Sequence, residues 1–348
     1  MSSQNPGPSG PSIEQLKKMG PPYPPSGASL GGIPTNSVDT PISSVIIALF
    51  ILSAALNMTI FQRNRRANHK FILSALLFGF SMARISANVM RIVWANYPHD
   101  AQIAIAANIL TNAGVLLLFI VNLILAQRIL RAHQPRLGWT KAVSLTFKAL
   151  YVVVVALLVM VIISTVYSFY TLDMHVRSEL RDIQLFAVTF LAVLAFLPIP
   201  IIVTTLLLPR AHPVEEFGKK GSMRTKLVLV LFTSTLLAFG AGFRAGVAYV
   251  QRPASNPAWF HHKAAYYCVN YLIELIVVFT YALSRFDLRF HVPNGSSKPG
   301  HYSNGVDGEV KDVVVTDEER PRTGAEEREK ERQWEADARN ELNRQAVV

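Results

Sequence analysis

Two charged side chains inside apolar stretches have the strongest potential for chemistry in this sequence. Arg84 and Glu274 each lie near the middle of a long apolar stretch, and they carry opposite charges. An ionisable group at the centre of a bilayer costs about 3 kcal/mol or more, so it is kept where it meets a partner, a ligand or an ion. We therefore predict that Arg84 and Glu274 pair across the interior of a helix bundle.

Further polar residues recur at helical spacing beside this pair. Asn88 and Arg91 follow Arg84 by four and seven residues, which places all three on one face of a helix. Asn270 precedes Glu274 by one helical turn. With polar residues from the third and sixth apolar stretches, the candidate ligand or ion pathway comprises Arg84, Asn88, Arg91, Asn108, Asn112, Arg244, Asn270 and Glu274.

Two interpretations of these polar residues stay open. In the first, they line a ligand or ion pathway, in which Arg91 and Arg244 attract an anion. In the second, the Arg–Glu pair is structural, and Asn108, Asn112 and Asn122, which we place on one face of the third stretch, make interhelical hydrogen bonds. Arg91 then extends to the outer membrane surface.

Prolines and glycines mark special points in two stretches. Pro198 and Pro200 remove backbone donors from the fifth stretch, so we expect a kink there. Such a kink suits a gating hinge, although membrane helices also carry proline without one. Gly242 and Gly246 in the sixth stretch have the spacing that permits close helix packing.

Motifs of enzymes and metal sites are missing. The nine histidines lie in loops, tails or the ends of apolar stretches, and no helical pair has ligand spacing. No phosphate-binding glycine loop is visible. Lys263 lies only at the edge of the last stretch, which argues against a retinal protein. We therefore expect no enzyme activity, no catalytic residue, no metal and no cofactor.

These residues belong to seven apolar stretches that dominate the composition. The chain has 348 residues, of which 51% are hydrophobic and 16% are charged. Each stretch is long enough for the roughly 20 residues that span a bilayer. Backbone groups find no water there, so the spans must be helices. We predict an all-α polytopic membrane protein, a seven-transmembrane helix bundle with spans near 42–62, 71–95, 102–127, 146–169, 183–208, 227–250 and 264–284.

The distribution of Lys and Arg among the short loops predicts the orientation. The first, third and fifth loops carry four, four and five of them, whereas the second, fourth and sixth carry none, two and two. Basic loops stay in the cytosol, so we expect the N-terminus outside and the C-terminus inside. The same bias explains the net charge of +11, and we expect no nucleic-acid binding. The plasma membrane is the default location.

Polar segments flank the spans. Residues 1–41 are rich in Pro, Gly and Ser and predict a disordered extracytosolic tail. Residues 285–348 predict a cytosolic tail, which begins with a short amphipathic segment suited to the inner membrane surface. A charged helix is expected near 325–345, where Trp334, Ala338 and Leu342 share one face and either remain solvated or dock a partner.

Several motifs resemble a family of fungal seven-helix membrane proteins that is defined only as a domain of unknown function. They are residues 68–71 (NHKF), 79–85 (GFSMARI), 91–95 (RIVWA), 105–108 (IAAN), 112–115 (NAGV), 122–123 (NL) and 127–132 (QRILRA). The resemblance spans about residues 20–295 and implies a fungal source and seven spans, but no reaction. The layout is also similar to fungal lipid-translocating-exporter-like resistance proteins and Pth-type receptors, although the Cys-rich outer domain of some of those receptors is missing.

The favoured interpretation is a receptor-like or sensor-like protein with a polar intramembrane site among spans 2, 3, 6 and 7. Its partners would be the lipid bilayer, a small-molecule or lipid ligand, and a cytosolic partner at the basic inner loops and the C-terminal tail. One alternative is a transporter or lipid-handling protein that uses the same polar interior. A second is a structural membrane protein with no ligand, in which the polar positions matter only for stability.

Overall fold

A computed structural model describes residues 13–23, 27–67, 71–209, 214–254 and 256–303. Within these ranges, seven helical spans are long and apolar enough to cross a membrane, which confirms the predicted all-α, seven-helix fold class. The spans are α2 (Asp39–Arg66), α3 (Ile72–Asn96), α4 with α5 (Ala101–Ala113, Leu116–His133), α7 (Lys141–Ser168), α8 with α9 (Met174–Phe196, Pro198–Leu207), α10 (Met223–Tyr249), and α11, η2 and α12 (Lys263–Tyr267, Cys268–Leu272, Ile273–Leu283). Shorter helices are α1 (Ile13–Met19), α6 (Pro135–Gly138), η1 (Trp259–His261) and α13 (Phe286–Arg289).

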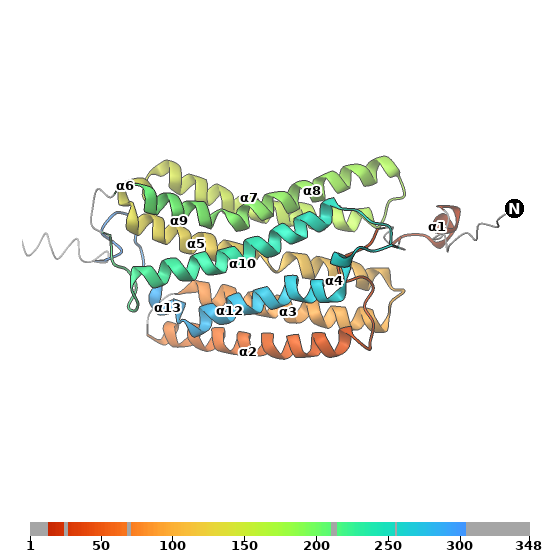
Figure 1. Ribbon diagram of the computed structural model, residues 1–348, viewed down its shortest axis with the longest axis horizontal. Coiled ribbons are helices and arrows are strands. Elements are labelled where there is room, and N and C mark those ends of the chain that lie inside the picture. The colour runs from red at the N-terminus through yellow and green to blue at the C-terminus, as the bar shows by residue number, and fades with distance from the viewer. Residues whose placement is uncertain (1–12, 24–26, 68–70, 210–213, 255, 304–348) are drawn as a thin grey trace, which may run out of the picture. The chain divides into compact units, whose positions relative to one another are not determined.

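The spans lie side by side along one common direction (Figure 1). Helix α2 packs on α3 and α12, α7 packs on α8, and α10 contacts α5, α8 and α12. The spans differ in burial: 61% of the most apolar window is buried in the third span and in the seventh, against 17% in α7. The third and seventh spans are therefore central, and α7 exposes most of its apolar surface to lipid.

Three of the seven spans are interrupted. The third breaks between α4 and α5, where the Leu117 amide donates to the Gly114 carbonyl in a tighter turn (3.3 Å). The fifth breaks at Leu197, because Pro198 cannot continue the hydrogen-bond ladder of α8. The interruption lies at the prolines where the kink is expected, and the kink and its use as a hinge both stay predictions. The seventh contains one π-helical turn, η2. Such turns often occur at functional sites.

The segment before the first span, residues 27–38, is here called the leader. Its Ala28 amide donates to the Arg252 carbonyl at 2.8 Å, and its Gly31 amide donates to the His261 carbonyl at 2.9 Å. The prediction of disorder up to residue 41 is therefore wrong for the leader and for the start of α2. Gly31 has φ +80°, and a Cβ there would lie 2.6 Å from the Tyr266 ring. Only glycine suits that position.

The other end of the bundle carries the loops that are rich in Lys and Arg. There the chain turns sharply after α12 at Arg285, whose φ is 51°, and α13 follows. Phe286 and Phe290 are fully buried, and the Phe290 carbonyl accepts a hydrogen bond from Arg128. The prediction of a segment lying on the membrane surface is therefore wrong, because its aromatic side chains pack inside the bundle. The charged helix expected near 325–345 falls outside the described residues.

Candidate functional site

The predicted ion pair between Arg84 of α3 and Glu274 of α12 is confirmed. Arg84 Nε donates to Glu274 Oε2 at 2.6 Å, and Arg84 Nη2 donates to Oε1 at 2.5 Å. Both side chains are almost completely buried. This is the two-point geometry in which a guanidinium binds a carboxylate most strongly, and it occupies both carboxylate oxygens.

The break in the third span positions Arg84. Its Nη1 donates to the Thr111 carbonyl at 2.5 Å and more weakly to the Leu110 carbonyl at 3.4 Å. Because α4 ends at Ala113, its last carbonyls lack intrahelical partners, and the negative end of the helix dipole lies there. A Cβ on Gly114 would approach Arg84 Cζ to 3.1 Å, so a small residue is needed where α4 meets α5.

Arg244 of α10 is the third charge at this site. Its Nη1 lies 3.5 Å from Asn270 Oδ1 and 3.7 Å from Glu274 Oε1. Both contacts are long for a guanidinium that has five N–H donors. We call Arg84, Arg244, Asn270 and Glu274 the cavity cluster. It holds two arginines and one carboxylate, and only Arg84 lies within hydrogen-bonding distance of that carboxylate.

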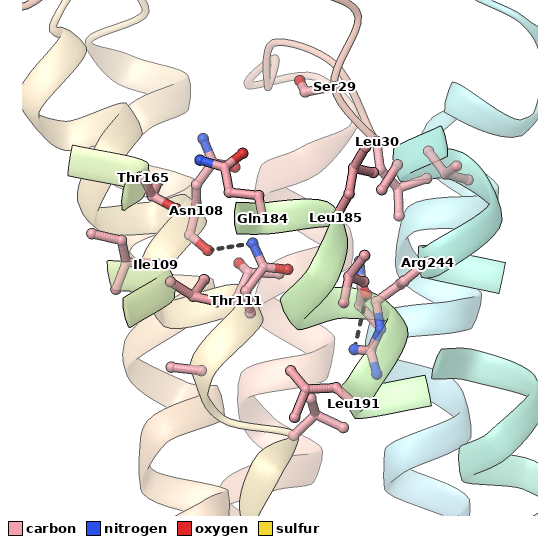
Figure 2. Close-up of a pocket in the computed structure, with 18 of the residues that line it drawn as sticks. Ser29, Leu30, Asn108, Ile109, Thr111, Thr165, Gln184, Leu185, Leu191 and Arg244 are labelled. Carbon is pink, nitrogen blue, oxygen red and sulfur yellow. Dashed lines mark hydrogen bonds between the residues drawn. The ribbon is translucent and has the colours of Figure 1, made fainter. Parts of the chain in front are cut away.

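Arg244 faces a cavity of about 450 Å³ in the leader-side half of the bundle. The cavity lies between α4, α5, α7, α8, α10 and η2, and the leader covers one end of it. Figure 2 shows Asn108 and Gln184 nearer the leader, where Ser29 and Leu30 lie, and Arg244 farther in. The volume is in the usual range for a small-molecule site.

The rest of the lining combines hydrocarbon side chains with arginines. Its hydrocarbon side chains include Leu116, Phe119, Leu158, Val161 and Leu191. Two further arginines, Arg181 and Arg252, also border the cavity. Among the described residues that line it, none is acidic. The site therefore combines an apolar wall with an excess of positive charge.

A second group of charges lies at the start of α2, beneath the leader. The Asp39 carboxylate is fully buried and accepts from Arg91 Nη2 at 3.0 Å, from Lys263 Nζ at 2.5 Å and from the Tyr267 hydroxyl at 2.8 Å. We call Asp39, Arg91, Lys263 and Tyr267 the leader cluster. Both of its cations contact its carboxylate directly.

Arg91 also holds the leader in place. Its Nη2 donates to the Gly31 carbonyl at 2.8 Å, and its Nη1 donates to the Gly32 carbonyl at 3.1 Å. Arg91 is 2% exposed and does not line the cavity. Arg91 therefore does not line the cavity with Arg244, because Asp39 and the leader bind it. Its extension to the outer membrane surface stays a prediction.

The remaining candidate residues divide into three that line the cavity and one that does not. Asn108, Asn112 and Asn270 line the cavity with Arg244, as predicted for a shared site. Asn88 is buried elsewhere and donates to the Arg84 carbonyl at 2.9 Å.

Asn122 does not line the cavity with Asn108 and Asn112. It donates to Ser234 at 3.0 Å and accepts from the Tyr281 hydroxyl, deeper in the bundle. The prediction of one polar face along the third span is therefore wrong.

Sequence reasoning missed Asp39, the carboxylate of the leader cluster. Asp39 falls within residues 1–41, for which the content of Pro, Gly and Ser predicts a disordered tail. A usable signal was present, since Asp39 is an acidic residue at the start of the first apolar stretch, on the side of the bundle where Arg91 and Lys263 lie. Two cations at one end of the spans call for an acidic partner.

A protein-family model matches part of the chain. The family model described as "Protein of unknown function (DUF3112)" matches residues 218–291, which contain Arg244, Asn270 and Glu274 but not Arg84. No curated protein matches the chain. The match supports similarity to an uncharacterised family and assigns no activity. The fungal origin, and the likeness to resistance proteins and receptors, stay predictions.

Proposed function

We propose that the protein is a receptor-like membrane protein that binds a small molecule in the cavity beside Arg244. The observation that carries this proposal is the incompletely bonded guanidinium of Arg244, which faces a cavity of about 450 Å³. A structural membrane protein has no use for an unmatched charge at membrane depth, because its burial is costly. A site that awaits a ligand accounts for it.

The lining of the cavity supports a sensing role. Gly27–Leu30 of the leader and Asn270 of η2 both border it, so a ligand would contact the leader and the segment that leads to Glu274. A ligand shifts a conformational equilibrium only through contacts that differ between states. Deeper in the bundle, Phe119 and Tyr281 are almost completely buried, and this packing favours binding over passage in this conformation.

A transporter is the second candidate, and the interrupted spans favour it. Two breaks, after α4 and at η2, flank the cavity cluster. Discontinuous helices around a central polar site are typical of secondary transporters. Flux measured in proteoliposomes distinguishes the two: a receptor binds the ligand without moving it across the bilayer.

The orientation belongs to the same proposal. The bias of basic loops favours a leader outside the cytosol, and the plasma membrane is the default location. The ligand would then reach the cavity from outside the cell. At the opposite end, Arg63, Arg65 and Arg224 are exposed and suit contact with anionic lipid or a cytosolic partner. Ser29→Cys in a Cys268→Ser background should react with an impermeant maleimide on intact cells. Labelling only after permeabilisation would contradict this orientation.

The binding claim is tested with the full chain in lipid nanodiscs. Decanoate, decanol and decyltrimethylammonium are titrated while the melting temperature is measured, since a ligand that binds only the folded state raises it. Val188→Trp fills the cavity, and Phe186→Trp is a matched control because Phe186 is exposed on the same helix. We expect the ligand to raise the melting temperature of wild type and of Phe186→Trp in a saturable way. This rise should be absent in Val188→Trp.

Sensing has its own readout in that experiment. Bound ligand should slow hydrogen exchange in residues 27–38, because the leader borders the cavity. The proposal is contradicted if none of the three compounds gives a saturable shift, or if the shift survives in Val188→Trp.

A further inference from the structure

The charges of the cavity cluster specify the charge of the ligand. Arg84 uses Nε and Nη2 on Glu274 and Nη1 on carbonyls of α4. Because Arg84 already binds both oxygens of Glu274, Arg244 approaches that carboxylate only to 3.7 Å. Two arginines against one carboxylate leave the cluster with a net positive charge, and the ion pair of Arg244 with Glu274 is longer than a hydrogen bond.

The surroundings of Arg244 reject cations and suit a single anion. Arg181 and Arg252 add positive charge to the cavity lining, and none of the described lining residues is acidic. Clefts lined by one sign of charge concentrate ligands of the opposite sign. A doubly charged head would exceed the single unmatched charge of the cluster, so a monoanion fits best.

The apolar wall specifies the rest of the ligand. Leu116, Phe119 and Leu158 line the same cavity as Arg244, and Leu191 lies beside it at the end away from the leader (Figure 2). A small inorganic anion would leave this hydrocarbon surface uncovered. The cavity volume of about 450 Å³ lies in the usual range for a small-molecule site, which suits a head with a medium-length chain.

We infer that the ligand is an amphipathic monoanion, a medium-chain carboxylate, whose head binds Arg244 and whose chain lies on the apolar wall formed by α5, α7 and α8. This inference rests on the proposed function and adds to it the chemical class of the ligand. Arg244 acts as the counter-charge to the head, and Asn112, which is exposed, is a further polar residue of the cavity lining.

The test compares head groups and arginines in nanodiscs, with the concentration for half-maximal thermal shift as the readout. Wild type should respond to decanoate at lower concentration than to decanol, and decyltrimethylammonium should give no saturable shift. Acetate, which has the head without the chain, should bind much more weakly than decanoate. Arg244→Gln should raise the half-maximal decanoate concentration about tenfold or more, as expected for a lost charge-assisted contact.

Arg224→Gln is the matched control, because Arg224 lies exposed on the same helix at the opposite end. It should respond to decanoate as wild type does, which separates binding in the cavity from partition into lipid. The inference is overturned if decanol or decyltrimethylammonium binds wild type as well as decanoate does, or if Arg244→Gln matches wild type. Should Arg244→Gln fail to fold, the comparison of decanoate, decanol and decyltrimethylammonium in wild type still tests whether the cavity prefers an anionic head.

The failures of the two proposals are distinguishable. If all three ten-carbon compounds bind equally and Val188→Trp abolishes their binding, the cavity binds ligands but the inference about charge is wrong. If none binds in a saturable way, both are wrong.

Discussion

The two charged clusters of this protein carry the same charges but differ in how closely their cations approach the carboxylate. Each contains one buried carboxylate and two cationic side chains. In the leader cluster, Arg91 and Lys263 both contact Asp39, at 3.0 and 2.5 Å. In the cavity cluster, Arg84 contacts Glu274 at 2.5 Å, but Arg244 stays 3.7 Å away. A closed cluster holds structure together, whereas an open one beside a cavity keeps the capacity to bind an anion.

The neighbouring backbone explains this difference. Arg91 shares its donors between Asp39 and the leader carbonyls, so its charge serves to attach the leader. Arg84 is held against Glu274 by the carbonyls at the end of α4. The break in the third span thus fixes one arginine on the carboxylate and leaves the other facing the cavity.

The largest effect should come from Glu274→Gln, which removes the carboxylate of the cavity cluster. Two arginines then remain buried without a counter-charge, and breaking such a buried pair typically costs about 3–5 kcal/mol. Thermal and denaturant unfolding in detergent measure this loss. A melting temperature equal to that of wild type would mean that water or lipid reaches the cluster, and the contrast between open and closed clusters would fail.

Asp39→Asn should have the next largest effect, of about 2–3 kcal/mol, because Lys263 is partly exposed and water compensates part of its charge. The change should also release the leader, since Arg91 loses the anion that orients it. Hydrogen exchange of residues 27–38 should accelerate more than that of α5. Equal acceleration in both segments would show that the leader cluster stabilises the whole bundle and does not specifically attach the leader.

Gly31→Ala should produce a smaller and local effect, of about 1–2 kcal/mol, because φ is +80° and the new Cβ would meet the Tyr266 ring. Gly32→Ala is the control: its φ is also positive, at +54°, but nothing lies within 4 Å of the added Cβ. Exchange of the leader amides should accelerate more in Gly31→Ala than in Gly32→Ala. The reverse order would contradict the packing of the leader on Tyr266.

Arg244→Gln should change the stability of the empty protein least, by about 1 kcal/mol or less and in either direction. It removes a charge whose burial is costly, and Glu274 keeps its contacts with Arg84. The free energy of unfolding of Arg244→Gln without ligand, compared with that of wild type and of Glu274→Gln under the same conditions, measures this change in stability. A loss as large as that of Glu274→Gln would make Arg244 a structural partner and remove the reason for assigning it to a ligand.

Hydropathy and charge were sufficient to predict the spans and the central pair. Seven apolar stretches exclude any fold other than a helix bundle at this length, and Arg84 and Glu274 have opposite charges at similar depth. The break at Gly114 was not predictable in this way, because no proline marks it and it depends on Arg84 binding the exposed carbonyls. The order of the leader likewise depends on tertiary contacts, chiefly Arg91 with Gly31 and Gly32, which composition does not reveal.

The most direct test of the central claim is a structure of the full chain bound to 10-bromodecanoate, with the bromine located by its anomalous scattering. We expect the carboxylate within hydrogen-bonding distance of Arg244 and the bromine against Phe119 or Leu191. Bromine only at the lipid-facing surface or among the basic loops, with the cavity free of ligand, would contradict the assignment of Arg244 as the anion-binding residue.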